Sequence, residues 1–209
     1  MVKKTIAISR FQGNIDWNEV SKDDVSYAFS RLGEGETYVD PTFVTNFTRS
    51  RDSHINTGAW HIYRAKSSTP EGQANTIITK LKEVGFKKDD NFAFVVNKHV
   101  GTNKTATSDE MSDNLYKLMS IILDSDLSIC NRQIYIKTNI DTWKNNLNWN
   151  KYSEFFKVFN LWVEQWRSEP NYPDILEPWG EGKWKFWEYS SNGRVNGING
   201  DVLISKLNT

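Results

Sequence analysis

The chain has 209 residues, and its 26 Lys plus Arg balance 26 Asp plus Glu, so its formal net charge is zero. This balance argues against a protein that binds nucleic acid through a broad basic surface. A hydrophobic content of 38% indicates a globular chain with a sizeable core, and no apolar run approaches the ~18 residues of a membrane span. One cysteine, Cys130, excludes an intrachain disulfide and a multi-cysteine zinc site, and its place after an apolar segment favours a buried thiol.

Short apolar runs that are typical of buried strands recur along the chain. They predict strands over residues 5–9, 26–30, 58–63, 92–96, 133–137, 158–163, 185–189 and 201–205. The run over 92–96 is the clearest, because it is apolar throughout. Continuous apolar strands of this kind fit a parallel sheet that is covered on both faces.

Two helices are predicted between these strands. Residues 70–82 follow Ser and Thr capping residues, begin with a proline, and space Ala74, Ile77, Ile78 and Leu81 on one face. Residues 108–123 have a similar apolar stripe. Alternating strands and helices predict a right-handed α/β barrel in one domain, residues 1–209, with helices missing from its second half. Barrel enzymes place their sites at the carboxyl ends of the strands.

Tryptophan is unusually frequent, since the chain has 9, and seven of them lie between Trp143 and Trp187. Indole combines a large apolar face with a polar edge, so clustered tryptophans suit flat ligands such as sugar rings. A tryptophan-rich core explains the same composition, and the composition favours that alternative.

Six motifs occur in order along the chain, at 8–17, 35–43, 58–61, 70–74, 134–136 and 187–202. Together they resemble the motifs of glycoside hydrolase family 25, the N-acetylmuramidase-type lysozymes. The resemblance implies an irregular (β/α)5(β)3 TIM-like barrel that acts on bacterial peptidoglycan or a related glycan without a cofactor. The scattered histidines His54, His61 and His99 show no metal-ligand spacing, so we expect no metal.

The chain departs from this family at its acidic positions. The resemblance implies an Asp-x-Glu pair at the end of the fourth strand, where this chain has Asn97 and His99. It also implies acids where the chain has Ala7 and Leu203. An amide cannot act as base or nucleophile. His99 can carry a proton, but the sequence offers it no carboxylate partner. We therefore expect lost or strongly reduced muramidase activity, as in a pseudoenzyme.

Other acids are possible substitutes for the missing pair. Glu34 matches a family glutamate near the groove, Asp201 survives at the last strand, and Glu188 replaces a family glutamine. Glu164 is a further candidate. The alternative is structural: Glu34 and Asp201 would hold loops, and Glu188 and Glu164 would be solvated or hydrogen-bonded side chains.

Aromatic and polar residues at motif positions are expected to bind sugar rings and their acetamide groups. These predicted binding residues are Tyr38, Trp60, His61, Tyr135, Trp162, Trp187 and Tyr189. Barrel packing is the alternative for many of them, and a histidine inside an apolar strand favours a buried structural role for His61.

Three hypotheses remain open: a glycan-binding protein with little hydrolysis, an active muramidase with relocated acids, and a protein-interaction scaffold. The first two have a wall glycan as partner, and the third has a protein. The sequence shows no export signal, which fits a product that is released from the cytoplasm or a trimmed secreted one. Localisation stays undetermined at this point.

Overall fold

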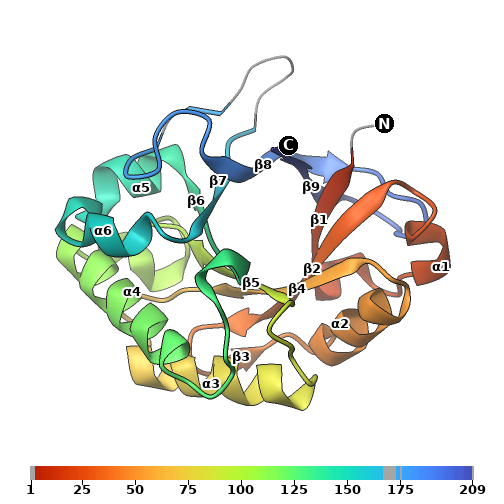
Figure 1. Ribbon diagram of the computed structural model, residues 1–209, viewed down its shortest axis with the longest axis horizontal. Coiled ribbons are helices and arrows are strands. Elements are labelled where there is room, and N and C mark those ends of the chain that lie inside the picture. Colours follow the sequence, from red (N-terminus) through yellow and green to blue (C-terminus); the bar gives the residue numbers. More distant parts are fainter. Residues whose placement is uncertain (1–2, 167–172, 175, 209) are drawn as a thin grey trace.

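Eight strands close into a barrel in the computed structural model, which describes residues 3–166, 173–174 and 176–208. Seven of them, β1 to β8 without β3, run parallel to their neighbours, and β1 pairs with β2. Strand β9 closes the ring by pairing antiparallel with both β8 and β1 (Figure 1). The barrel strands are β1 (Lys4–Ile8), β2 (Val25–Glu34), β4 (Asn56–Ile62), β5 (Asn91–Val96), β6 (Ile134–Asn139), β7 (Asn160–Glu164), β8 (Trp184–Gly193) and β9 (Val202–Leu207).

The helices follow the first five barrel strands and cover the outside of the barrel (Figure 1). They are α1 (Trp17–Val20), α2 (Phe43–Asp52), α3 (Pro70–Glu83), α4 (Ser108–Leu123), α5 (Ile140–Asn146) and α6 (Ser153–Phe156). In the part of the chain that the structure describes, no helix separates β7, β8 and β9. The predicted irregular (β/α)5(β)3 barrel is therefore confirmed.

Local sequence explains where the two longest helices begin. The Thr69 side chain accepts a hydrogen bond from the Gly72 amide, and Pro70 opens α3. Thr107 and Glu110 form a reciprocal capping box at the start of α4. The sequence pattern did not indicate α1, α2, α5 and α6, which are shorter or more polar, nor the two-residue strand β3 (Tyr38–Val39).

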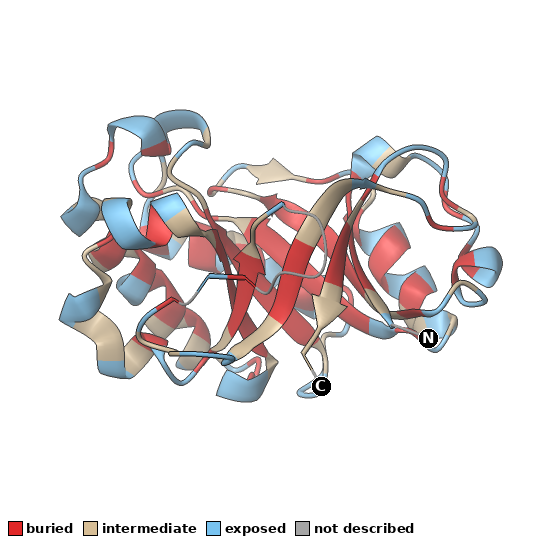
Figure 2. Ribbon diagram, turned by 90° about the horizontal axis from the view of Figure 1, so that it is seen from above, coloured by how far each residue is buried: buried red, intermediate tan, exposed pale blue. Residues whose placement is uncertain are grey.

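Aromatic side chains fill the inside of the barrel. Phe29 lies among them, with ring-centroid distances of 4.8 Å to Trp162, 5.5 Å to Tyr135 and 5.8 Å to Phe186. The strands are buried at the centre while the outward faces of the helices are exposed (Figure 2). The interior is a packed core, so a ligand has to bind at an end of the barrel.

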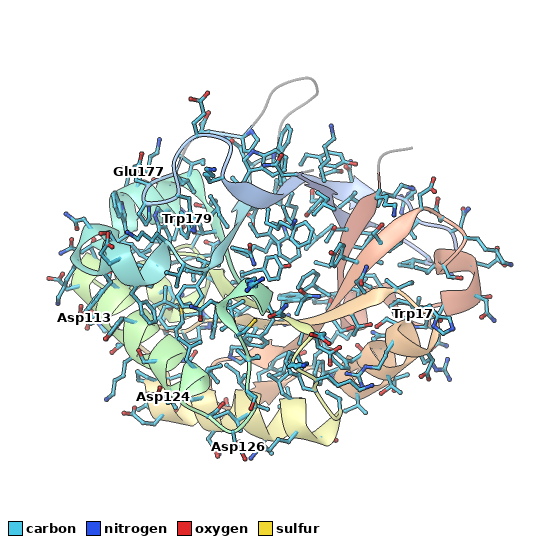
Figure 3. The ribbon with its side chains drawn as sticks, viewed as in Figure 1. Trp17, Asp113, Asp124, Asp126, Glu177 and Trp179 are labelled. Atoms are coloured by element: carbon cyan, nitrogen blue, oxygen red, sulfur yellow. The ribbon has the colours of Figure 1, made fainter. Side chains whose placement is uncertain are left out.

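Most of the clustered tryptophans are structural. Trp143 is fully buried in the layer between barrel and helices, and its indole N–H donates to the Glu177 carbonyl at 2.6 Å. Its ring contacts that of Trp179 at 4.8 Å, and Figure 3 shows Trp179 and Glu177 close to α5. The core alternative for the tryptophan excess therefore accounts for these residues.

Cys130 is exposed, so the expectation of a buried thiol was wrong. It lies just before the start of β6, at the surface loop that enters the strand.

Among the described residues, no helix is long and apolar enough to cross a membrane.

Gly58 is required where β4 passes the central Phe29. A Cβ at this position would lie 2.5 Å from Phe29 Cδ1, well inside van der Waals contact. We expect Gly58→Ala to lower the free energy of unfolding by about 1–3 kcal/mol, because the overpacked ring cannot move freely. Chemical denaturation measures this loss. Adding Phe29→Leu should give a double variant that loses less than the sum of the two single variants, and strict additivity would contradict the clash.

Candidate functional site

A cavity of about 450 Å³ opens at the carboxyl ends of the parallel strands, and we call it the groove cavity. Ala7, Trp60 and Leu203 contribute its apolar part. The Trp60 indole N–H donates to the Ile8 carbonyl at 3.0 Å, which fixes the ring against the end of β1. Its other lining residues are Ser9, Phe11, Gln12, Arg31, Ser191 and Asp201.

Ala7 and Leu203 are register partners on the paired strands β1 and β9. Both line the groove cavity, and neither carries an ionisable group. Asp201 lies nearby, but its carboxylate is 3.0 Å from Arg194, and its side chain is 59% exposed. This wall of the cavity is therefore apolar at both positions where the resemblance leads us to expect acids.

Asn97 and His99 follow β5 at the same end of the barrel. The Asn97 side-chain oxygen accepts a hydrogen bond from the His99 amide at 2.8 Å, so this amide orders the turn. His99 is exposed, and its Nε2 lies 2.9 Å from a carboxylate oxygen of Asp141. The expectation that His99 lacks a carboxylate partner was wrong. Asp141 lies in the first turn of α5, and no sequence spacing links it to His99.

Hydrogen bonds keep the Asp141 carboxylate ionised. The side chain of Asn145, followed by His99, lowers the pKa of Asp141. An ionised aspartate hydrogen-bonded to an imidazole orients the ring. The pair could therefore hold and move a proton at the rim of the barrel.

Glu34 ends β2 between two arginines. Its Oε2 lies 2.5 Å from the Arg31 guanidinium, and its Oε1 pairs with Arg64. The Arg31 guanidinium also stacks over Tyr38 and Trp60, at 5.0 and 5.4 Å from their ring centroids. Guanidinium groups thus engage both oxygens of the Glu34 carboxylate, which leaves this acid poorly placed to give a proton to a substrate.

Glu188 is the deepest acid at this end of the barrel, with a side chain only 1% exposed. Its Oε2 lies 2.5 Å from Lys137 Nζ, and Trp166 donates to its Oε1 at 3.5 Å. Burial raises the pKa of Glu188, and Lys137 opposes that shift. Glu164 stands opposite it in the β7–β8 register and adds to the increase. Glu188 is therefore engaged in a buried ion pair, out of contact with solvent.

The predicted sugar-binding residues divide into three groups. Tyr38 and Trp60 line cavities at the carboxyl end. Tyr135 and Trp162 pack inside the barrel, where their polar atoms bond to Asn91 and Ser205. His61, Trp187 and Tyr189 belong to the opposite strand faces, since side chains alternate along β4 and β8. The sequence therefore identified the strands correctly, but it could not separate inward from outward positions.

Two exposed aromatics at the groove end were missed by the sequence analysis. Phe11 lines the groove cavity and is 70% exposed, and Trp166 follows β7 and is 58% exposed. Arg31, Arg64 and Lys137 were missed as well. The sequence feature that could have identified them is a charged residue within an apolar strand or directly after it.

Comparisons with known proteins agree with this geometry. Residues 6–198 match the family model described as Glycosyl hydrolases family 25. The chain is 27% identical over 215 residues to Lysozyme M1 of Streptomyces globisporus, covering 97% of this chain and 67% of that protein. It is 28% identical over 207 residues to the autolytic lysozyme of Clostridium acetobutylicum, covering 98% of this chain but 55% of that protein. A bacterial lysozyme structure from Streptomyces coelicolor superposes with a TM-score of 0.82 at 24% identity, covering 100% of this chain and 93% of that one.

Lys137→Met should leave the buried carboxylate of Glu188 without its partner cation. We expect a loss of about 3–5 kcal/mol in the free energy of unfolding, because an uncompensated charge remains in the barrel. Lys151→Met is the matched control, since Lys151 forms an exposed pair with Asp113 at 2.7 Å, and it should cost less than about 1 kcal/mol. Equal losses in urea denaturation would contradict the buried pair.

His61 should make folding sensitive to acid. Burial, assisted by the charge of Arg31, lowers the pKa of His61 to about 3. The unfolded chain binds this proton near pH 6.5, so stability is present above that pH and falls as the pH decreases toward 3. Between pH 6.5 and 4.5 the loss from this group should be about 2 kcal/mol.

Urea denaturation at several pH values measures the His61 contribution. His61→Asn should have a shallower pH dependence than the unaltered chain. His54→Asn is the control, because His54 is exposed and its positive φ of 59° suits asparagine. Identical slopes for the two variants would show that His61 does not titrate as inferred.

Proposed function

Because the chain belongs to glycosyl hydrolase family 25, we propose that it binds bacterial peptidoglycan or a related glycan in the groove cavity, with lost or strongly reduced hydrolysis. The observation that carries this proposal is the state of the acids at the carboxyl end of the barrel. Ala7 and Leu203 supply none, and Glu34, Glu188 and Asp201 are each paired with a cation.

Glycoside hydrolysis requires two carboxyl groups beside the scissile bond, one of them protonated. Glu34 is paired with two arginines, and Glu188 is paired with Lys137 below the surface. Asp201 pairs with Arg194. No pair drawn from these acids combines an accessible proton donor with a free carboxylate. Removal of one acid/base group alone lowers turnover by about 10²–10⁴-fold.

The groove cavity has the chemistry of a sugar site. Trp60 and the exposed Phe11 provide apolar surfaces for the ring faces of a sugar. Ser9, Gln12 and Ser191 line the same cavity with groups that bond to hydroxyls and acetamides. A mixture of flat apolar faces and neutral polar groups supports binding of a glycan without requiring its cleavage.

Weak residual muramidase activity is the second candidate, and the His99–Asp141 pair favours it. His99 follows β5, and its Nε2 lies 2.9 Å from a carboxylate oxygen of Asp141. An imidazole that a carboxylate orients can act as a general acid toward a leaving oxygen. Asn97 beside it offers no carboxylate, so this route lacks the second group that fast turnover needs.

Purified cell-wall sacculi test the two candidates. The unaltered chain should sediment with sacculi but release few new reducing ends. The variant Ala7→Asp/Asn97→Asp/His99→Glu/Leu203→Asp restores acids at the family positions and should release many more reducing ends. Rapid clearing of sacculi by the unaltered chain would overturn the loss of activity, and failure to sediment would overturn glycan binding. Slow release that disappears in His99→Ala would favour the second candidate.

Phe11→Ala tests whether sugar rings pack on the groove cavity. Phe11 is 70% exposed, so its removal should leave the free energy of unfolding nearly unchanged. We expect retention on sacculi to weaken about 5- to 12-fold if one sugar face loses its aromatic contact, which is worth about 1–1.5 kcal/mol. Val158→Ala, another exposed apolar residue just before β7, is the control and should bind like the unaltered chain. Equal retention by both variants would place the glycan elsewhere.

A further inference from the structure

A second cavity, of about 520 Å³, adjoins the groove cavity, and we call it the arginine pocket. Its cationic lining residues are Arg10, Arg31 and Arg64, and Glu34 is its one acidic lining residue. Asp40 lies close by, but its carboxylate already accepts hydrogen bonds from the Arg10 and Thr42 amides at 3.1 and 2.9 Å. Three cations against these two anions leave an excess of positive charge.

Several buried donors of the arginine pocket lack partners. Arg31 Nε, Arg64 Nη1 and the Tyr38 hydroxyl are shielded from solvent and make no hydrogen bond to any described residue. The Arg31 and Arg64 side chains are only 10% and 15% exposed. A buried donor without an acceptor costs about 1–3 kcal/mol. These donors therefore suit a ligand that brings several acceptor oxygens at once.

Glycines shape the pocket around one guanidinium. Gly101 has a φ of +48°, and a Cβ there would overlap the guanidinium of Arg64. Gly35 has a φ of +59°, and a Cβ there would meet Ser68 Oγ and the Arg64 side chain. The local backbone thus holds Arg64 in the pocket, where Ser67 and Thr102 add hydroxyl donors at the rim.

Arg31 lines both cavities, so a glycan in the groove cavity can place a substituent in the arginine pocket. Guanidinium groups bind carboxylates and phosphates through paired, charge-assisted hydrogen bonds. We propose that the arginine pocket binds an oxyanion substituent of the glycan, either a carboxylate or a phosphate. This inference rests on the proposed glycan function and names the class of glycan that the groove accepts.

Soluble sugars test the pocket without sacculi. Calorimetric titrations compare neutral N-acetylglucosamine, N-acetylmuramic acid, which carries a carboxylate, and N-acetylglucosamine 6-phosphate. We expect at least one anionic sugar to bind about tenfold more tightly than the neutral sugar, as charge-assisted bonds predict. The tighter of the two identifies the source of the oxyanion, and inorganic phosphate should compete with it.

Thr102→Asp places a negative charge at the pocket rim on an exposed residue, so it should fold normally. It should abolish the preference for anionic sugars. Thr105→Asp is the matched control, since it lies on the same turn, is exposed and does not line the pocket. It should keep the preference. Equal behaviour of the two variants, or no preference in the unaltered chain, would overturn the proposal.

The outcomes separate this proposal from the function on which it rests. Retention on sacculi without any preference for anionic sugars would disprove the arginine pocket and leave glycan binding intact. A preference for anionic sugars without retention on sacculi would support the pocket and disprove the wall glycan as partner. Failure of all sugars and of inorganic phosphate to bind would overturn the pocket.

Discussion

Buried charge must be paired, and this requirement governs the carboxyl end of the barrel. Lys137 and Glu188 meet at 2.5 Å with side chains only 5% and 1% exposed, and Arg31 pairs with Glu34 at the end of β2. A buried charge without its partner raises the free energy of the folded state. Neither partner of such an ion pair can therefore turn to a substrate unless another group replaces it. The same pairing that stabilises this end of the barrel engages the carboxylates of Glu188 and Glu34 with cations. The carboxylates that stabilise this end of the barrel through ion pairs are the same groups that proton transfer would require.

The strands were predictable because each is an apolar run bounded by polar residues, and the family motifs supplied their order. The side chains that build the site were less predictable. Alternation along a strand states that Trp60 and His61 face opposite ways, but not which of them faces the groove. The partners Arg31 and Arg64 of Glu34, and the His99–Asp141 pair, join residues from different elements. Only closure of the barrel brings such residues together, so no local pattern reveals them.

The groove cavity and the arginine pocket divide recognition between them. One offers flat apolar surfaces and neutral hydrogen-bonding groups, and the other offers excess positive charge. A chain with zero formal net charge can therefore attract an anionic ligand through local placement of its arginines. The neutral side chains of Ala7 and Leu203 in the groove cavity assist this, because carboxylates at these positions would repel the same ligand. Binding of acidic glycans and loss of cleavage are in this respect physically compatible.

The packing of Phe29 with Tyr135, Trp162 and Phe186 has a consequence for how a polymer can approach. These rings block passage through the barrel, and the Tyr135 hydroxyl is tied to Asn91 at the start of β5. A long glycan strand, if bound as proposed above, therefore cannot thread the molecule and has to lie across the carboxyl end of the barrel. Units on both sides of the bound sugar then project over the surrounding loops. In this mode the protein can bind at the middle of a glycan strand and needs no free end of that strand.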